Sequence, residues 1–518
     1  MNIAEFLAIP NSICPDREAV VYEGATWTYA QLHDRVRQLS AGLARLGVGK
    51  GDRVAMIQVN CPQTLELCMA LATRGATLVP LNFRARADEF AYLLNDSKPR
   101  CLFAGIRYLP MAIELRSRMP QLGEIVSMDQ RSAGTAFYDD LLVPAEDEST
   151  QTEVDDKDVA VLLYTSGTTG TPKGVQLSHG AFSSYVLANV EPPIPGVTHS
   201  ILMALPLHHV AGIQTVLASF FGGRTIVLMA QFEPGEWLRT AQTHRVNRAL
   251  LVPTMLKALI DYPTFSHFDL SSLQVITYGA ASMPLETITR AIELMPWVKF
   301  FNAFGQTETA SSIAVLGPED HVLRGTPAEV DKKLKRLASS IGKPLPGVEI
   351  RIVADGKTLP PFTIGEIAVK SAQVMSGYWG GAEKPVTLFT PDGWLLTRDT
   401  GWMDDEGYVY LAGRADDVIK RGGEMISPEE VENVLSSHPA VKDAAVIGVP
   451  DMEWGHQPRA LVVLKNGASA TQEELIEYCH VRLAGFKRPR SVIFVDSIPR
   501  NQLGKPLRKQ LREHYGRP

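Results

Sequence analysis

The sequence predicts an α/β fold with a large N-terminal domain of βα layers that includes an antiparallel sub-barrel, and a small, mobile α+β C-terminal domain. Three observations lead to this prediction. The chain has 518 residues, which is too many for one ordinary core. Helical and strand patterns alternate through its first part, as in a largely parallel sheet. The pattern changes near Ile341 and again at Asp416, so we place the domains at 1–415 and 416–518.

The N-terminal domain begins with clear helix and strand patterns in alternation. Apolar residues at helical spacing predict a helix over 28–46, which Gly47 should end. The strand VAMIQV, a helix over 64–73 and the strand TLVPL follow. Further strands are expected at RTIVLM, RALLVPT and LQVITYG. This order predicts parallel strands joined by helices.

Short strands with Gly and Pro turns replace this alternation after Ile341. The segments IGKPLPGVEIRIV, GEIAVK and GYVYLAGR predict antiparallel strands. Beyond Arg414, the segments AAVIGV, RALVVL and SVIFV and a helix over 472–483 predict the small C-terminal unit.

Composition excludes several functional classes. Hydrophobic content of 45%, charged content of 21% and a net charge of −6 are those of a globular protein that does not bind nucleic acid as a whole. Five scattered cysteines without a C-x-x-C motif predict reduced thiols in a cytoplasmic protein. The N-terminus does not resemble a signal peptide, and the apolar stretch 201–223 carries two histidines and Gln214, which argues against an integral membrane segment.

The stretch LLYTSGTTGTPKGV at 162–175 predicts a phosphate-binding loop. Bare N–H groups and hydroxyls would donate to phosphate oxygens and Lys173 would supply charge, although a flexible surface loop is the alternative. The loop is not a P-loop, because Pro172 precedes the lysine and opposes a helix there. The dinucleotide-binding fingerprint is also absent from it.

Five motifs occur in an order that resembles the adenylate-forming superfamily of acyl-CoA synthetases, luciferases and adenylation domains. They are TSGTTGTPKG, FGQTE, TRDTG, GRADDVIKRGGE and PRNQLGKPLRK. The resemblance spans nearly the whole chain, with one departure at Arg398, where most relatives have glycine. It implies that a carboxylate and ATP form an acyl-adenylate and pyrophosphate, with Mg²⁺ and coenzyme A as the other cofactors. Fixed donors and cations aimed at the phosphates should dominate such a reaction.

The resemblance assigns the ATP-binding residues. The mobile loop would bind the β and γ phosphates, with Lys173 acting when the loop closes, through residues Thr165, Ser166, Gly167, Thr168, Thr169 and Gly170. In FGQTE, Phe304 would stack on adenine, Thr307 would donate to the α-phosphate, and Glu308 would bind Mg²⁺ through its hard oxygen atoms. A surface Glu308 and a core Phe304 are the alternatives.

Further residues are expected around the nucleoside. Asn302 would hydrogen-bond the adenine edge, and the small turn Gly279, Ala280 and Ala281 would let the purine approach the backbone. A hairpin centred on the turn 404–407 should bring Asp399 and Arg414 to the same open end. A carboxylate for the ribose hydroxyls and a neighbouring guanidinium fit one nucleoside site, although a surface salt bridge is the alternative.

The C-terminal domain should carry the residues that change place between half-reactions. By resemblance, Lys505 meets the carboxylate and the α-phosphate during adenylation, whereas Gly422 and Gly423 line the tunnel for the CoA thiol arm. Both lie beyond the expected hinge at Asp416, so the domain must swing. A solvated basic face is the alternative for the stretch around Lys505.

The acid pocket is expected in the segment ALPLHHVAGI. It has no carboxylate to pair an amino acid's ammonium, and His209 matches the pocket histidine of acyl- and aryl-CoA synthetases. Val210 and Ile213 are apolar, which indicates a neutral, largely apolar acyl group. A core histidine is the alternative for His209.

We therefore predict an acid–thiol ligase, an AMP-forming acyl-CoA synthetase. It would be a cytoplasmic enzyme of fatty-acid or other acid metabolism, and a homodimer is left open. The alternatives are an adenylation enzyme that loads a carrier-protein phosphopantetheine, and a non-catalytic nucleotide-binding regulator, which would be expected to lack Glu308 or Lys505.

Overall fold

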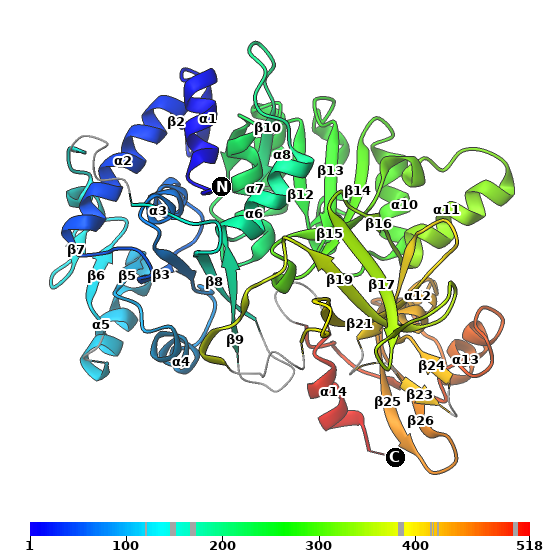
Figure 1. Cartoon of the computed structure of the whole chain (residues 1–518). Coiled ribbons are helices and arrows are strands. Elements are labelled where there is room, and N and C mark those ends of the chain that lie inside the picture. Colours follow the sequence, from blue (N-terminus) through cyan, green and yellow to red (C-terminus); the bar gives the residue numbers. More distant parts are fainter. Residues whose placement is uncertain are drawn as a thin grey trace.

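Two large sheets and a smaller C-terminal sheet organise the chain in this computed structural model (Figure 1). The structure describes residues 1–119, 122–145, 152–165, 172–381, 388–414, 417, 419–421, 424–500 and 506–517. Among these residues, no helix is both long enough and apolar enough to cross a membrane.

The first sheet has eight strands in the order β20-β9-β8-β4-β3-β5-β6-β7. Its strands are β3 (Arg53–Ile57), β4 (Thr77–Pro80), β5 (Cys101–Ala104), β6 (Glu124–Ser127), β7 (Ala136–Phe137), β8 (Val159–Thr165), β9 (Lys173–Ser178) and β20 (Gly377–Tyr378). The central pairs are parallel, whereas β8 and β9 form an antiparallel hairpin.

The second sheet has fourteen strands in the order β18-β17-β19-β21-β22-β16-β15-β14-β13-β12-β10-β11-β1-β2. The strands that come earlier in the sequence are β1 (Glu18–Tyr22), β2 (Ala25–Thr28), β10 (Ser200–Met203), β11 (Thr225–Leu228), β12 (Arg248–Leu251), β13 (Val275–Gly279) and β14 (Lys299–Gly305). The strands from β10 to β14 pair in parallel, which confirms the prediction from the alternating pattern.

The remaining strands of this sheet are antiparallel, as predicted after Ile341. They are β15 (Ser312–Leu316), β16 (Ser340–Pro344), β17 (Val348–Ala354), β18 (Lys357–Thr358), β19 (Gly365–Ser371), β21 (Leu395–Met403) and β22 (Val409–Arg414). Their ladder continues the parallel part through β15 and, among the described residues, does not close on itself. The expected sub-barrel is therefore an open arm of the large sheet.

Helices cover the outer faces of the two sheets and fill the space between them. The helices are α1 (Glu5–Ile13), α2 (Tyr29–Arg45), α3 (Pro62–Thr73), α4 (Ala87–Ser97), α5 (Leu109–Arg118), α6 (His179–Asn189), α7 (Val210–Phe221), α8 (Pro234–Thr243), α9 (Pro253–Ile260), α10 (Leu285–Leu294) and α11 (Pro327–Ser339). Side chains alternate along the strands: in β3, Val54 faces the central core and Ala55 faces the core under α4 and α5. In β10, Ile201 faces the central core and Leu202 faces the core under α8 to α10. Each sheet is thus packed on both faces, as parallel strands require.

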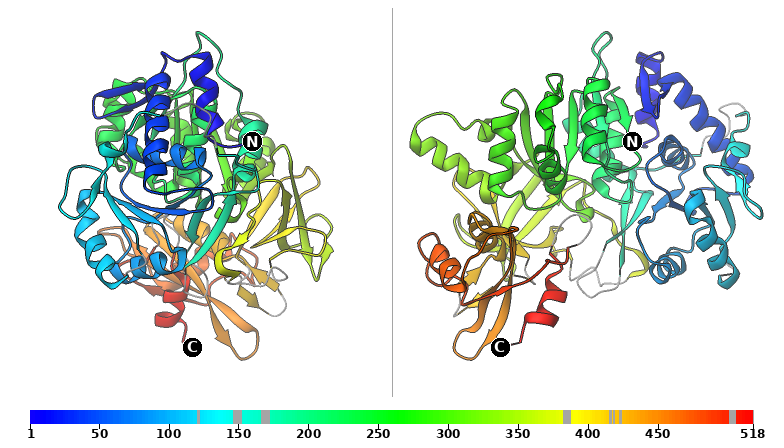
Figure 2. Two further views of the ribbon diagram at one scale, coloured as in Figure 1. Left: turned by 60° about the vertical axis from the view of Figure 1, so that its left-hand side comes forward. Right: turned by 180° about the vertical axis from the view of Figure 1, so that it is seen from behind.

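The C-terminal domain has a five-stranded sheet and three helices. Its elements are β23 (Ile419–Arg421), β24 (Glu424–Ile426), β25 (Val441–Asp451), β26 (Gly455–Leu464), β27 (Ser491–Phe494), α12 (Pro428–Ser436), α13 (Gln472–His480) and α14 (Arg508–Tyr515). The view from behind shows this segment, in orange and red, below the green and yellow strands (Figure 2). Asp417 forms an ion pair of 2.8 Å with Arg512 of α14, and the boundary between 415 and 416 stays a prediction. The boundary residue Asp416 lies outside the described residues.

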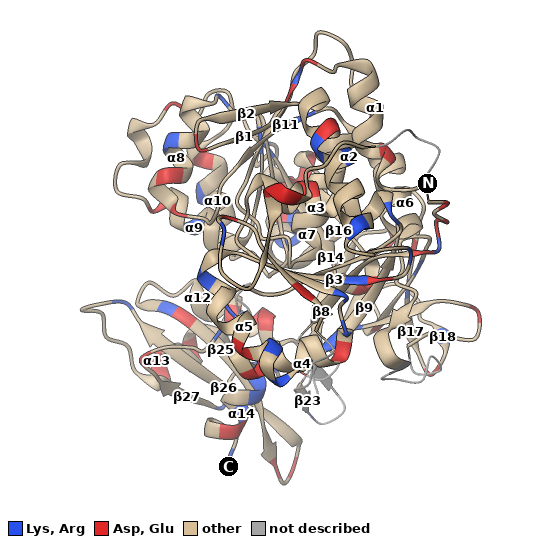
Figure 3. Cartoon of the chain, turned by 90° about the vertical axis from the view of Figure 1, so that its left-hand side faces the viewer, with Lys and Arg blue, Asp and Glu red and all other residues tan. Residues whose placement is uncertain are grey.

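Lys and Arg positions and Asp and Glu positions are interspersed along the helices (Figure 3). This distribution is consistent with the net charge of −6.

Candidate active site

The predicted phosphate loop joins the two strands of the β8–β9 hairpin. Thr165 is the last residue of β8, Lys173 is the first of β9, and the two are paired across the ladder. The hairpin therefore holds both ends of the loop at fixed positions. The predicted loop residues Ser166, Gly167, Thr168, Thr169 and Gly170 lie outside the described residues.

Tyr378 connects Lys173 to Glu308. The Lys173 ammonium lies 5.3 Å from the centre of the Tyr378 ring, within the range of a cation–π contact. The hydroxyl of the same tyrosine donates a hydrogen bond of 2.9 Å to Oε1 of Glu308. Two residues that lie far apart in the sequence are thus brought to one place through an aromatic ring that the sequence analysis did not select.

The FGQTE motif ends a strand and opens a turn, as predicted. Strand β14 ends at Gly305, and a 3₁₀ turn over Thr307–Thr309 follows. The turn is fixed at both ends, because the Gln306 N–H donates to Oγ1 of Thr309 and the Met375 N–H donates to the carbonyl of Glu308. Thr307 and Glu308 are both half-buried, so their side chains retain access to solvent.

The predicted adenine residues lie at the ends of the neighbouring strands β13 and β14. Gly279 pairs with Ala303, and a Cβ atom at Gly279 would lie 2.1 Å from the Ala303 carbonyl oxygen. Ala280 has a φ of +66°, so the chain turns sharply there. Ala281 follows this turn and is half-buried.

The side chains of Asn302 and Phe304 make contacts within the protein. The Asn302 amide donates to the Ser340 carbonyl at 3.4 Å. Phe304 packs against the apolar core of the antiparallel arm. Both are half-buried, and their contact with adenine stays a prediction.

The predicted hairpin between Asp399 and Arg414 is confirmed. Strands β21 and β22 pair these two residues directly, and the turn begins at Asp404, whose carbonyl accepts from the Gly407 N–H. Arg398 has a φ of +61°, the left-handed conformation that glycine adopts at little cost. At this departure from the family pattern an arginine therefore adopts a conformation that glycine favours.

A cavity of about 200 Å³ begins beside the residues predicted to bind the nucleotide. It is lined near the strand ends by Gly279, Ala280 and Gly305, and it runs along β12 and β13. One face of α7 forms its wall, with residues at helical spacing: Val210, Ala211, Gln214, Thr215, Ala218 and Ser219. The cavity therefore extends from Gly305, two residues before Thr307, along the two strands, and has room for part of an acid.

Of the three predicted acid-pocket residues, Val210 lines this cavity. Ile213 lies on the other face of α7, where it is fully buried in the central core. His209 precedes the helix and its ring lies 4.3 Å from that of His208. Burial and the charge of Arg84 lower the pKa of His209 to about 4, so this histidine is neutral at pH 7.

Comparison with known proteins shows to which family the chain belongs. The model of the AMP-binding enzyme family matches residues 11–379, and that of the AMP-binding enzyme C-terminal domain matches residues 430–505. The chain belongs to the AMP-binding enzyme family.

Relatives of this AMP-binding enzyme differ in their named acceptors. A feruloyl-CoA synthase from Amycolatopsis sp is 35% identical over 97% of this chain and 96% of its own length. The fatty acid–[acyl-carrier-protein] ligase ScoC of Streptomyces coeruleorubidus is 32% identical over 97% of this chain and 94% of its own. The structure of the amide bond synthetase McbA from Marinactinospora thermotolerans superposes with a TM-score of 0.87 at 30% identity, and 99% of each chain is covered.

Several predicted residues of the AMP-binding enzyme lie outside the described part of the chain. These are Lys505, Gly422 and Gly423, together with the loop residues named above. The side chain of Arg414 also lies outside it, although its backbone is placed. Their roles stay predictions.

The sequence analysis missed three groups that the fold brings to the site. Tyr378 arrives because β20 pairs with β9. Arg224 and Arg248, which line the cavity, stand directly before β11 and at the start of β12. An arginine at the start of each apolar strand, in RTIVLM and RALLVPT, was the available signal.

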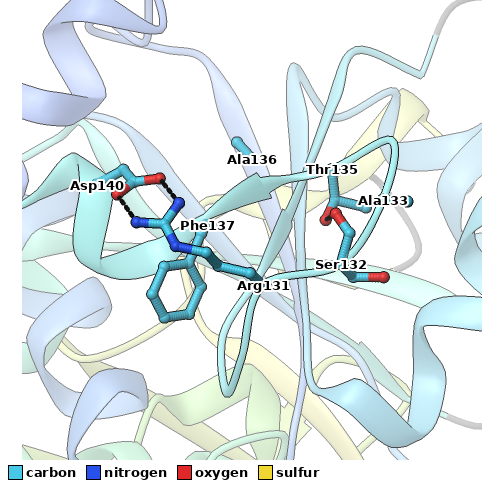
Figure 4. Close-up of a pocket in the computed structure, with 7 residues that line it drawn as sticks. All are labelled: Arg131, Ser132, Ala133, Thr135, Ala136, Phe137 and Asp140. Carbon is cyan, nitrogen blue, oxygen red and sulfur yellow. Dashed lines mark hydrogen bonds and ion pairs between the residues drawn. The ribbon is translucent and has the colours of Figure 1, made fainter.

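A second pocket is lined by residues of the turn before β7 and of β7 itself (Figure 4). Arg131 lines it, but both of its terminal nitrogens bind Asp140 at 2.5 Å and its guanidinium stacks on Phe137. The Arg131 guanidinium is thus paired within the protein at this surface pocket.

Proposed function

We propose that this protein is an ATP-dependent acyl-CoA synthetase. It activates a carboxylic acid as an acyl-adenylate with release of pyrophosphate, and then transfers the acyl group to CoA with release of AMP. The observation that supports this proposal is the link from Lys173 through Tyr378 to Glu308, which follows the cavity-lining residue Gly305 by three positions in the chain. Tyr378 thus brings a cation and a carboxylate together close in the chain to a cavity that an acid could occupy.

The roles of these residues follow from where charge develops. When a carboxylate oxygen attacks the α-phosphorus, negative charge builds on the α-phosphate and on the departing pyrophosphate. Lys173 and the loop between β8 and β9 would stabilise the β and γ phosphates, and Thr307 would donate to the α-phosphate. The thiol sulfur of CoA would then attack the acyl carbon, and AMP would leave with the bond electrons.

Glu308 is the residue proposed to hold Mg²⁺. Carboxylate oxygens suit this ion, which is bound in such sites by one or two carboxylates and by the phosphates of the substrate. Among the described residues, no cluster of three His, Cys, Asp or Glu side chains could hold a metal by itself. The Glu308 carboxylate therefore fits a Mg²⁺ ion that enters together with ATP. When bound, this ion would neutralise phosphate charge.

The acceptor is the part of the proposal that needs a direct test. A panel of carboxylic acids should be supplied with ATP and Mg²⁺, and pyrophosphate, AMP and thioester should be measured with and without CoA. We expect thioester and AMP in equal amounts. Pyrophosphate release without any CoA thioester would remove the synthetase assignment.

Loading of a carrier protein is the second candidate, because one relative is named a fatty acid–[acyl-carrier-protein] ligase. Adding a phosphopantetheinylated carrier protein to the same assay distinguishes the two. The cytoplasmic location, the homodimer and the neutral, largely apolar acyl group expected from the sequence stay predictions; apolar cavity residues such as Val210 and Leu251 support an acid with an apolar body.

A further inference from the structure

The cavity is polar at the end that lies farthest from the nucleotide region. Arg248 is the first residue of β12 and pairs with Val275, the first residue of β13. Gly279, at the last position of β13, lines the opposite end. Four residues of strand span about 13 Å. An acid whose reacting carboxylate lies beside Gly279 and Gly305 would therefore extend toward Arg248 and Arg224.

These two arginines have no acidic partner in the described part of the chain. No salt bridge is formed there by either guanidinium. The ionisable groups that act on Arg224 are Arg248, Tyr185 and Tyr29, and His199 lies close enough to feel the charge of both arginines. Burial and the charge of Arg248 lower the pKa of Arg224 to about 10, and burial also lowers that of Arg248. Both side chains are half-buried, and two neighbouring cations in such a position without an anion are costly unless a ligand supplies the opposite charge.

Two further polar side chains of the cavity wall also lack partners. Both amide atoms of Gln214 and the hydroxyl of Ser219 are buried without a hydrogen bond within the protein. Gln214 is 5% exposed and Ser219 is 0% exposed. Both lie on the face of α7 that lines the cavity. Because buried polar groups are nearly always hydrogen-bonded, they indicate a polar ligand at this end of the cavity.

We propose that the substrate is a dicarboxylic acid. One carboxylate is adenylated beside Gly305, and the other remains ionised and pairs with Arg248 and Arg224, with Gln214 and Ser219 able to bind oxygen atoms of the acid. This inference rests on the proposed function and names its substrate class. It also revises the expectation of a neutral acyl group: the body of the acid is apolar and its far end is anionic.

The test uses a homologous series of linear dicarboxylic acids from succinate to sebacate, each compared with its own monomethyl ester. The ester keeps one reactive carboxylate and the chain but removes the second charge. With the whole protein, ATP and Mg²⁺, we expect kcat/KM for pyrophosphate release to be at least tenfold higher for the diacid than for its ester at one or more chain lengths. An ester that equals or exceeds its diacid at every length overturns the inference.

Two variants test whether the arginines cause any preference for the diacid over its ester. In Arg248→Gln and Arg224→Gln the ratio of diacid to ester should fall about tenfold, because each removes one of the two cations. Arg239→Gln is the matched control, since this arginine lies on the surface of α8 with its side chain 56% exposed and should leave the ratio unchanged. Equal losses for diacid and ester in the cavity variants would show that the arginines only support the fold.

A binding measurement keeps the inference separate from catalysis. Isothermal titration of the same diacids should show binding to the protein that Arg248→Gln weakens at least tenfold. If neutral acids are activated but no diacid is preferred or bound, the inference fails and the proposed function stands. If no acid of a broad panel releases pyrophosphate but diacids still bind through Arg248, the proposed function fails instead.

Discussion

The Tyr378 hydroxyl donates a 2.9 Å hydrogen bond to Oε1 of Glu308, and this contact joins the two large sheets. Tyr378 belongs to β20, which is paired with β9 of the first sheet, whereas Glu308 follows β14 of the second. The Met375 N–H strengthens the junction by donating to the Glu308 carbonyl. The carboxylate proposed to hold Mg²⁺ is therefore oriented by a residue from the opposite sheet.

Replacing Tyr378 by Phe removes this hydrogen bond and leaves the ring beside Lys173. A hydrogen bond to a charged group contributes about 1.5–3 kcal/mol, so we expect adenylation to fall roughly tenfold to a hundredfold. The Mg²⁺ concentration for half-maximal pyrophosphate release should rise, because the Glu308 carboxylate would no longer be held in place. Tyr478→Phe, at a half-buried tyrosine of α13 whose hydroxyl donates to the Ser437 carbonyl, serves as the control. An unchanged Mg²⁺ dependence in Tyr378→Phe would show that the hydrogen bond from Tyr378 to Glu308 has no role in metal binding.

Lys505→Ala should affect the two half-reactions differently. One preorganised charge aimed at developing charge contributes about 3–4 kcal/mol, so adenylation should fall by about 10² to 10³. Thioester formation from supplied acyl-adenylate should change far less, because the domain rotation would carry the lysine away. The exposed Lys509 of α14 offers a matched control as Lys509→Ala. Equal losses in both half-reactions would give Lys505 a structural role.

Asp416→Pro tests the predicted hinge. Proline fixes φ near −65°, so the substitution should trap one orientation of the C-terminal domain. Where the adenylating orientation tolerates this φ, pyrophosphate exchange survives and thioester formation collapses, with the circular dichroism spectrum and melting temperature retained. Normal rates in both half-reactions would place the pivot elsewhere or exclude a rotation.

The stability of the folded chain should fall as the pH is lowered from 7 to 5, in part through His321. Burial lowers the pKa of this histidine to about 4 from its ordinary 6.5, and its ring forms hydrogen bonds with the Tyr278 hydroxyl and the Gly317 carbonyl. In the unfolded chain this histidine is protonated below about pH 6.5, whereas in the folded chain it stays neutral down to about pH 4. Stability is therefore complete above pH 6.5 and is lost toward pH 4, by about 2 kcal/mol at pH 5 for this one group.

Urea unfolding of His321→Gln at pH 7 and pH 5 measures this contribution. The variant should be less stable at pH 7, but its stability should decline less between the two pH values than that of the parent chain. His480→Gln, at a half-exposed surface histidine, should retain the full decline. The same decline in all three proteins would show that other groups account for it.

Local signals explain why much of the fold was predictable. The helix expected over 28–46 is α2, Tyr29–Arg45, because Thr28 caps it and Gly47 takes a φ of +72° at its end. The pairing of Asp399 with Arg414 followed from the turn between them, since a short hairpin fixes its own register. Both predictions depended on residues close together in the sequence.

The parts of the site that were missed depend on packing between distant segments. Val210 and Ile213 are both apolar residues of α7, and only the orientation of the helix decides that the first lines the cavity and the second the core. Tyr378 reaches Lys173 because β20 pairs with β9, and no local sequence pattern predicts this pairing. Arg224 and Arg248 become neighbours only because β11 and β12 flank β10 in the same sheet.

The close approach of β13 and β14 at Gly279 limits how the protein can diversify. Any side chain at Gly279 would meet the Ala303 carbonyl oxygen, so that end of the cavity is built from backbone and cannot be varied without separating the strands. The far end is built from the side chains of Arg224, Arg248 and Gln214, which can be exchanged without moving a strand. Selection for new acids, in nature or in a mutant library, should therefore accumulate changes at the far end, while the adenylating chemistry is inherited intact.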